Sequence, residues 1–169
     1  MKVNDMNVTV SIVTHNSDKI FLSLDSLIRS LGKDQSIQIK IFDNASEVKY
    51  QERLAKYLEY SFVSIEFFEE NKGFGFGHNA NLLGVSGYGI IFNPDIILSE
   101  NHLNEMVKHL ADHPKCGLLA PKILNEDGTT QYLIRNHLDV FDYMLRFIPF
   151  KFVKRLFAKR LAKFECRDL

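Results

Sequence analysis

Short apolar segments rich in β-branched residues alternate with amphipathic segments along most of this chain. The segments that predict β-strands are residues 8–13, 37–42, 62–68, 88–92 and 117–120. The intervening segments that predict helices are residues 18–31, 48–59 and 100–112. Strands that alternate with helices at this spacing favour right-handed βαβ units. We therefore predict an α/β fold with a mainly parallel sheet flanked by helices.

The composition is that of an ordinary globular protein. The chain has 169 residues, of which 46% are hydrophobic and 25% charged, and its formal net charge is zero. This balance predicts no nucleic-acid partner. Cys116 and Cys166 lie far apart, which indicates reduced thiols, and no signal sequence or membrane-spanning run is evident. We expect a cytoplasmic protein with a main domain over residues 1–135 and a helical segment over residues 136–169.

Polar clusters follow four of the predicted strands in succession. They lie at residues 14–16, 43–46, 71–79 and 93–95. Parallel α/β sheets bind ligands at the carboxyl ends of their strands. Any single cluster also fits an ordinary polar turn, but four in order indicate one shared site.

The order of these clusters resembles that of family 2 glycosyltransferases. The sequences VSIVTHN, IFDNAS, NKGFGFGHN and IIFNPDI are most similar to the rhamnosyltransferase-like branch, and the resemblance covers about residues 8–135. It implies a GT-A (Rossmann-like) domain that takes a sugar, with rhamnose a candidate, from a dTDP- or UDP-linked donor. The implied acceptor is a polysaccharide or a lipid-linked saccharide, and the implied transfer is inverting. The spacing of Gly73, Gly75 and Gly77 differs from that of the dinucleotide fingerprint.

The resemblance also assigns candidate contacts to the donor. Asp43 has the acceptor oxygens to bind the imide N–H of a pyrimidine, although an Asx-turn is the alternative interpretation. The full set of candidate substrate-binding residues is Thr14, Asn16, Asp43, Asn44, Gly73, Phe74, Gly75, Gly77, Asn79 and Asn93.

The glycine-rich stretch predicts a loop followed by a helix that begins near His78. Glycines allow the backbone to approach a ligand, and a helix N-terminus favours an anionic diphosphate. Phe74 and Phe76 either wall the pocket or pack beneath the loop, and we expect packing for at least one of them. His78 is interpreted as a hydrogen-bonding residue rather than a metal ligand, because no second histidine stands at metal-site spacing.

Asp95 is the candidate metal ligand. Family members carry a short acidic motif here, and this chain has Asn93-Pro94-Asp95, which leaves one carboxylate. One carboxylate together with diphosphate oxygens and waters suits Mg²⁺ or Mn²⁺ as a cofactor. The alternative is that Asp95 serves only as a turn residue after Pro94.

The catalytic base that inverting transfer needs is not found. The acids after Arg135 are Asp139, Asp142, Glu165 and Asp168, and none stands in the family's acidic motif. The chain is therefore interpreted as a truncated reading frame, a fragment, or a donor-binding module. The competing hypotheses are a transferase, a non-catalytic remnant or module that binds a nucleotide sugar, and a nucleotidyltransferase or another α/β nucleotide binder.

The last stretch is basic and rich in phenylalanine. A helix beginning after Pro149 would place on one face the residues Phe150, Val153, Phe157, Leu161 and Phe164. Its basic residues outnumber its acids, which is typical of a helix that lies on a membrane surface. Peripheral contact with the inner face of the cytoplasmic membrane would suit a lipid-linked acceptor. A core-packing helix with a solvated basic face is the alternative.

Overall fold

The computed structural model describes residues 7–31, 37–99, 102–132 and 140–166. It divides into two compact units, residues 1–119 and residues 120–169, and each is described by itself.

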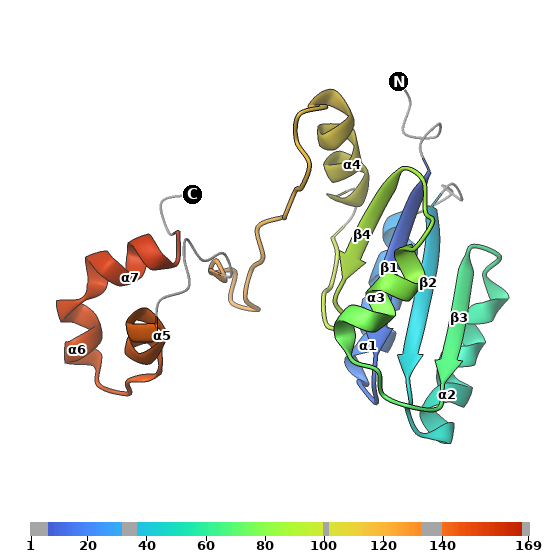
Figure 1. Ribbon diagram of the computed structural model, residues 1–169, viewed down its shortest axis with the longest axis horizontal. Coiled ribbons are helices and arrows are strands. Elements are labelled where there is room, and N and C mark those ends of the chain that lie inside the picture. Colours follow the sequence, from blue (N-terminus) through green and yellow to red (C-terminus); the bar gives the residue numbers. More distant parts are fainter. Residues whose placement is uncertain (1–6, 32–36, 100–101, 133–139, 167–169) are drawn as a thin grey trace. The chain divides into compact units, whose positions relative to one another are not determined.

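The described part of the first unit contains one parallel four-stranded sheet in the order β3-β2-β1-β4 (Figure 1). Its strands are β1 (Val8–Thr14), β2 (Ile37–Asn44), β3 (Val63–Phe68) and β4 (Tyr88–Phe92). Every residue of β1 is buried, which explains its continuous run of β-branched residues, because a central parallel strand is covered on both faces. This arrangement confirms the predicted α/β class and parallel sheet.

Helices cover both faces of the sheet (Figure 1). On one face, α1 (Lys19–Leu31) and α2 (Val48–Leu54), the latter followed by the 3₁₀-helix η2 (Ala55–Glu59), pack on an aliphatic core. Ile20, Leu24 and Leu27 form the buried stripe of α1 because they recur every three or four residues. On the other face, α3 (Phe74–Leu82) crosses β1 and β2. Helix α4 (His102–Asp112) packs against α1 and adds Leu103 and Val107 to the aliphatic core.

Two sequence predictions for this unit are wrong. Residues 117–120 form no strand, and Leu118 is 88% exposed, so this stretch lacks the buried face that would hold it in a sheet. The helix expected near His78 begins instead at Phe74. Packing against the sheet therefore outweighs the low helix propensity of Gly75 and Gly77.

The described part of the second unit has little regular structure before Val140. The turn around Asn125 and Gly128 is present, but the suggested hairpin is reduced to one antiparallel bridge between Leu124 and Thr130. Three short helices follow, α5 (Val140–Phe147), α6 (Lys151–Leu156) and α7 (Ala158–Phe164). The single helix predicted after Pro149 is thus two helices, since the backbone leaves helical geometry at Phe157.

Candidate functional site

The parallel register brings the ends of three strands into one row. Thr14 at the end of β1 pairs with Asp43 on β2, and Asp43 pairs with Phe67 on β3. The sheet edge predicted to bind a ligand is therefore formed by residues from separate parts of the sequence.

Asp43 is the most unusual polar residue at this edge. Its side chain is 0% exposed. The Oδ2 atom accepts hydrogen bonds from the Ser46 amide at 3.2 Å and from Nε2 of Gln51 at 2.7 Å. The Oδ1 atom has no hydrogen-bond partner among the residues that the structure describes. Because buried polar groups are nearly always paired, this oxygen indicates a place for an external donor.

A pocket lies beside Asp43, at the carboxyl ends of β2 and β3. Its volume is about 390 Å³, and it is lined by Ala45, Ser46, Gln51, Phe67, Phe68 and Glu69. Two of these lining residues, Ser46 and Gln51, are the ones that hold Oδ2 of Asp43. The two phenylalanines offer apolar surface, so the pocket combines ring-stacking walls with a nearby buried acceptor, as a flat heterocyclic base requires.

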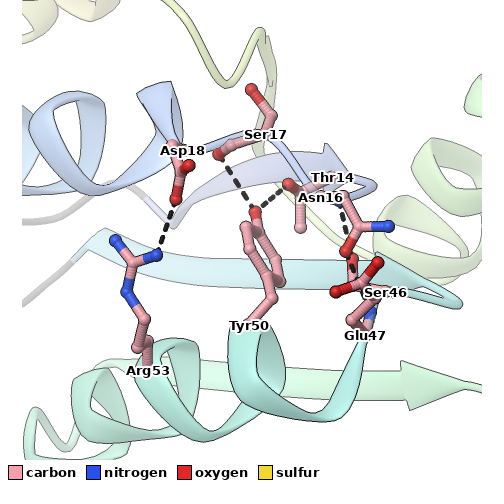
Figure 2. A network of polar contacts seen from close by, with 8 residues as sticks. All are labelled: Thr14, Asn16, Ser17, Asp18, Ser46, Glu47, Tyr50 and Arg53. Carbon is pink, nitrogen blue, oxygen red and sulfur yellow. Dashed lines mark hydrogen bonds and ion pairs between the residues drawn. The ribbon is translucent and has the colours of Figure 1, made fainter.

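Asn16 joins the loops that follow β1 and β2 (Figure 2). Its amide donates to Oγ of Ser46 at 2.9 Å, and its Oδ1 accepts from the amide of Glu47 at 2.9 Å. Asn16 has a φ of 49°, a left-handed conformation that asparagine tolerates better than most residues. These two contacts hold the backbone at Ser46 and Glu47, and so position the Ser46 amide that donates to Asp43.

The Thr14 hydroxyl is hydrogen-bonded to the Tyr50 hydroxyl, which also donates to the Ser17 carbonyl at 3.2 Å (Figure 2). Burial raises the pKa of Tyr50, so its hydroxyl keeps its proton near neutral pH. With that proton directed to Ser17, Thr14 is the donor to Tyr50. Thr14 therefore supports the loop that follows β1 through Tyr50. Towards a ligand, its hydroxyl oxygen could act only as a hydrogen-bond acceptor.

Asn44 ties β2 to the start of the glycine-rich segment. Its Nδ2 donates to Oδ1 of Asn71 at 2.7 Å, and its Oδ1 accepts from the amide of Lys72 at 2.7 Å. The amide of Gly73 also donates to Asn71 Oδ1. Asn44 thus positions the turn at Gly73, where φ is +87° and a side chain would be strained.

Gly77 lies where α3 crosses the sheet. A Cβ atom at this position would lie 2.7 Å from Cγ2 of Val13 and 2.9 Å from Cδ1 of Phe42. The glycine therefore serves close helix–sheet packing rather than a flexible loop. Gly75, two residues earlier in the same helix, has open space where a Cβ would be.

The phenylalanines and asparagine of this stretch have different surroundings. Phe76 packs against Phe42 and Phe68, which confirms the expected packing role for one of the two phenylalanines. Phe74 is half exposed and makes an edge contact with the His78 ring at 4.3 Å. Asn79 is exposed on α3, and its assignment to the donor stays a prediction.

His78 is buried under α3 in a polar cluster. Its Nδ1 is hydrogen-bonded to Oγ of Ser11 at 2.7 Å, and Asn81 Nδ2 donates to the same Oγ at 3.0 Å. The Nε2 atom has no partner among the described residues. Burial lowers the pKa of His78, because the charged ring would lose its hydration.

The low pKa of His78 predicts a stability loss in mild acid. The folded chain keeps the ring neutral, whereas the unfolded chain takes up a proton near its ordinary pKa of about 6.5. The lowered pKa of His78 therefore affects the free energy of unfolding. The full contribution of the neutral ring is present above the pKa of the unfolded chain, and it is lost as the pH falls towards the lower pKa of the folded chain. We compare the free energy of unfolding, measured in urea, at about pH 7.5 and about pH 5.5, on either side of the ordinary pKa. We expect it to fall less in His78→Asn than in the parent. An equal fall in both would contradict this. His102→Asn, at an exposed histidine, is the control and should keep the parent's slope.

Asp95 lies in an exposed turn after β4, together with Asn93. The Ile96 amide donates to the Asn93 carbonyl at 3.3 Å, so the turn that was the alternative interpretation of Asp95 does form. Two buried serines of α1 hold the following residues: Ser23 Oγ donates to the Ile96 carbonyl at 2.6 Å, and Ser26 Oγ accepts from the Leu98 amide. The turn is therefore anchored while its carboxylate stays free to meet solvent.

No ready-made cluster of metal ligands accompanies Asp95. In the ranges that the structure describes, no three His, Cys, Asp or Glu side chains are close enough to hold a metal ion. Protein atoms near Asp95 would therefore supply one carboxylate, with the remaining ligands coming from a diphosphate and water, which is how Mg²⁺ is commonly bound.

Several residues of this edge were not predicted from the sequence. They are Ser23, Ser26, Tyr50, Gln51 and Phe67, which reach the site through the fold rather than through a local motif. In the sequence, each is a polar or aromatic residue within an otherwise apolar helix face or strand. The sequence alone does not show which residue each one contacts.

The two described acids near the C-terminus belong to the second unit and are buried within it. Asp142 is buried and ion-paired with Arg160, and Glu165 is also buried. Asp139 and Asp168 lie outside the described residues.

Comparison with known proteins supports the fold assignment. No protein-family model and no curated protein sequence matches the chain. The solved structures that resemble it include mannosyltransferase PcManGT from Pyrobaculum calidifontis in complex with GDP-Man and Mn²⁺. The TM-score is 0.57 at 22% sequence identity, over 64% of this chain and 33% of the mannosyltransferase.

A second group of similar structures is TarS from S. aureus. TarS 1-349 gives a TM-score of 0.57 at 18% identity, over 72% of this chain and 40% of TarS. The same protein in complex with UDP gives 0.57 at 19% identity, with the same coverage. This chain therefore spans a third to two fifths of these solved structures. The parallel sheet, its flanking helices and these similarities together show a GT-A type glycosyltransferase fold.

Proposed function

We propose that the first unit binds a nucleoside diphosphate sugar and forms the donor-binding part of a glycosyltransferase. The observation that carries this proposal is the buried Asp43, whose Oδ1 atom has no partner among the described residues. It lies at the carboxyl edge of a parallel sheet, beside a pocket with two phenylalanines. A base-sized ligand with a suitably placed N–H would pair the orphaned oxygen.

The chemistry of a carboxylate restricts which bases fit. Uracil and thymine present an imide N–H, and guanine presents a ring N–H, so each donates to Asp43. Cytosine and adenine present an acceptor nitrogen at the equivalent edge and would face the carboxylate unfavourably. The GDP-Man and UDP held by the similar structures belong to the favoured group. We therefore propose a UDP-, dTDP- or GDP-linked donor.

Access to Asp43 requires a local movement. Its oxygens are screened from solvent, and the Gln51 side chain lies across Oδ2. Gln51 is partly exposed, so a short displacement of its side chain would open a path to the carboxylate. The base would then pair with Oδ1, while the Ser46 amide still donates to Oδ2.

Asp95 fits a divalent cation as its single protein carboxylate. It is exposed, and Ser23 and Ser26 hold the backbone that follows it. A cation bound there would neutralise the negative charge that develops on the departing nucleoside diphosphate. The Mn²⁺ in the similar mannosyltransferase supports this assignment.

Asp95→Asn should remove the metal dependence of donor binding. Asparagine keeps the size and the turn but lacks the charge that attracts the cation. In calorimetric titrations with UDP-glucose and dTDP-rhamnose, we expect Mg²⁺ or Mn²⁺ to raise the parent's affinity about tenfold, the lower end of the 10–100-fold range for groups that support a metal site. The variant should bind equally with and without metal. Asp112→Asn, at an exposed aspartate of α4, is the matched control. A metal effect of equal size in Asp95→Asn would rule out this role.

Hydrolysis of the donor separates two functions. Metal-dependent release of UDP or dTDP from the sugar nucleotide, in the absence of acceptor, would support a transferase. Tight binding with no release would support a nucleotide-sugar-binding module instead. Asp142 and Glu165 are the acids of the described range 140–166, and both are buried, which supports the binding module as the second candidate function. Failure of all three donor classes to bind a folded sample would exclude both.

The acceptor and the cellular site extend this proposal. A polysaccharide or lipid-linked saccharide made on the cytoplasmic side of a membrane is the acceptor class that we propose, with rhamnose as one candidate sugar. A panel of sugar nucleotides in the hydrolysis assay tests the sugar directly.

A further inference from the structure

Helix α5 exposes an apolar stripe. Val140, Met144 and Phe147 recur at intervals of four and three residues, so they lie on one side of the helix. Met144 is 63% exposed and Phe147 is 76% exposed. The opposite side of α5 faces inward through Asp142 and Leu145, which are both buried.

The exposed apolar side chains continue into α6. Phe152 is 73% exposed, and Leu156, one turn further, is 79% exposed. The Phe150 ring is also exposed, and its centroid lies 5.9 Å from that of Phe152. We call the aromatic surface the set formed by Val140, Met144, Phe147, Phe150, Phe152 and Leu156.

This surface differs from the face predicted from the sequence. Of the predicted face, Leu161 and Phe164 are buried, and the Phe164 ring contacts Tyr143. These two positions are therefore core, as the alternative interpretation of the basic helix expects. The exposed apolar residues lie on α5 and α6 instead.

The charge around the aromatic surface has one sign. Lys154, Arg155, Lys159 and Lys163 are exposed in the described part of residues 140–166. The acids in the same range are buried, and Asp142 receives a two-pronged hydrogen bond from Arg160. Exposed aromatic side chains are thus accompanied by exposed cations and by no exposed carboxylate in that described range.

We propose that the aromatic surface docks on an anionic lipid bilayer, independently of donor binding. Aromatic and aliphatic side chains would enter the headgroup and acyl boundary, and the lysines and Arg155 would meet lipid phosphates. A second copy of this chain is a poorer occupant, because facing copies would bring like charges together. No described helix is long and apolar enough to cross a bilayer, so the contact would be interfacial.

The test is sedimentation of the whole chain with vesicles. We expect binding to phosphatidylglycerol–phosphatidylcholine vesicles, much weaker binding to phosphatidylcholine alone, and weakening as salt is raised. Combined Phe147→Ser, Phe152→Ser and Leu156→Ser substitutions should lower the affinity at least about tenfold, since buried apolar area sets interfacial binding. These side chains are exposed, so the variant should fold, and near-ultraviolet circular dichroism checks this.

The matched control carries Leu22→Ser, Leu83→Ser and Leu118→Ser, three exposed leucines of the first unit. It should bind vesicles as the parent does. An equal loss in the control, no vesicle binding by the parent, or no preference for the anionic lipid would overturn the proposal. Self-association in sedimentation velocity without lipid binding, abolished by the triple variant, would identify a contact between copies and would also overturn it. Asp43→Asn should leave vesicle binding unchanged, which separates this result from that of the donor site.

Discussion

Replacing Asp43 with asparagine should weaken UDP binding about tenfold to a hundredfold, the loss expected for one hydrogen bond to a charged group. The asparagine oxygen can keep the Oδ2 position, where the Ser46 amide and Gln51 donate. The amide nitrogen then takes the place of Oδ1, which has no partner among the described residues. A uracil imide N–H would meet another N–H group instead of an acceptor. Isothermal titration calorimetry measures the change directly.

The matched control is Glu52→Gln. Glu52 is an exposed carboxylate on α2, so this change removes one negative charge without altering the buried acceptor. It should bind UDP as the parent does. Equal UDP affinity in the parent and a folded Asp43→Asn variant would show that Asp43 does not contact the base, and the Asx-turn would then be its whole role.

Replacing Gly77 with alanine should destabilise the fold by about 1–3 kcal/mol, the cost of overpacking a tight contact. The added Cβ would lie 2.7 Å from a methyl group of Val13 and 2.9 Å from the Phe42 ring. Both neighbours are buried, so relief requires α3 to move away from β1 and β2. Movement of α3 would also shift the turn at Gly73 that Asn44 and Asn71 hold. Urea unfolding measures the stability.

Gly75→Ala is the control for this effect because it lies in the same helix with open space at the Cβ position. Alanine is favoured over glycine within a helix by about 1 kcal/mol, so Gly75→Ala should be neutral or stabilising. The two alanine variants should therefore differ in sign. A Gly77→Ala variant as stable as Gly75→Ala would contradict the close-packing role.

The sequence predicted the sheet well because burial of a parallel strand demands a particular residue type. Few structures other than a buried strand explain the β-branched run in β1. Likewise, an amphipathic helix is the structure that best explains the spacing of Ile20, Leu24 and Leu27. The predicted strand at residues 117–120 failed because sequence did not reveal that Leu118 lacks a neighbour to bury it. The start of α3 was missed because close packing at Gly77 overrides a poor local propensity.

The candidate site was only partly readable from the sequence. For Asp43, Oδ2 accepts from the Ser46 amide three residues on, a local contact of the kind that the Asx-turn interpretation expects. Its contact with a base stays a prediction, which the lack of a described partner for Oδ1 supports. The supporting contacts of Tyr50 and Gln51 depend on α2 folding back over the ends of β1 and β2. A local motif carries no information on such long-range pairing, so these roles required the structure.

The most direct test of the account is the ratio of UDP to CDP affinity in the parent and in Asp43→Asn, measured by titration calorimetry. The two nucleotides differ in the base edge that faces Asp43, because uracil donates where cytosine accepts. The account predicts that the parent prefers UDP by at least about tenfold, the value of one well-placed hydrogen bond, and that Asp43→Asn removes or reverses this preference. Equal affinities for UDP and CDP in the parent, or a ratio that Asp43→Asn leaves unchanged, would contradict it.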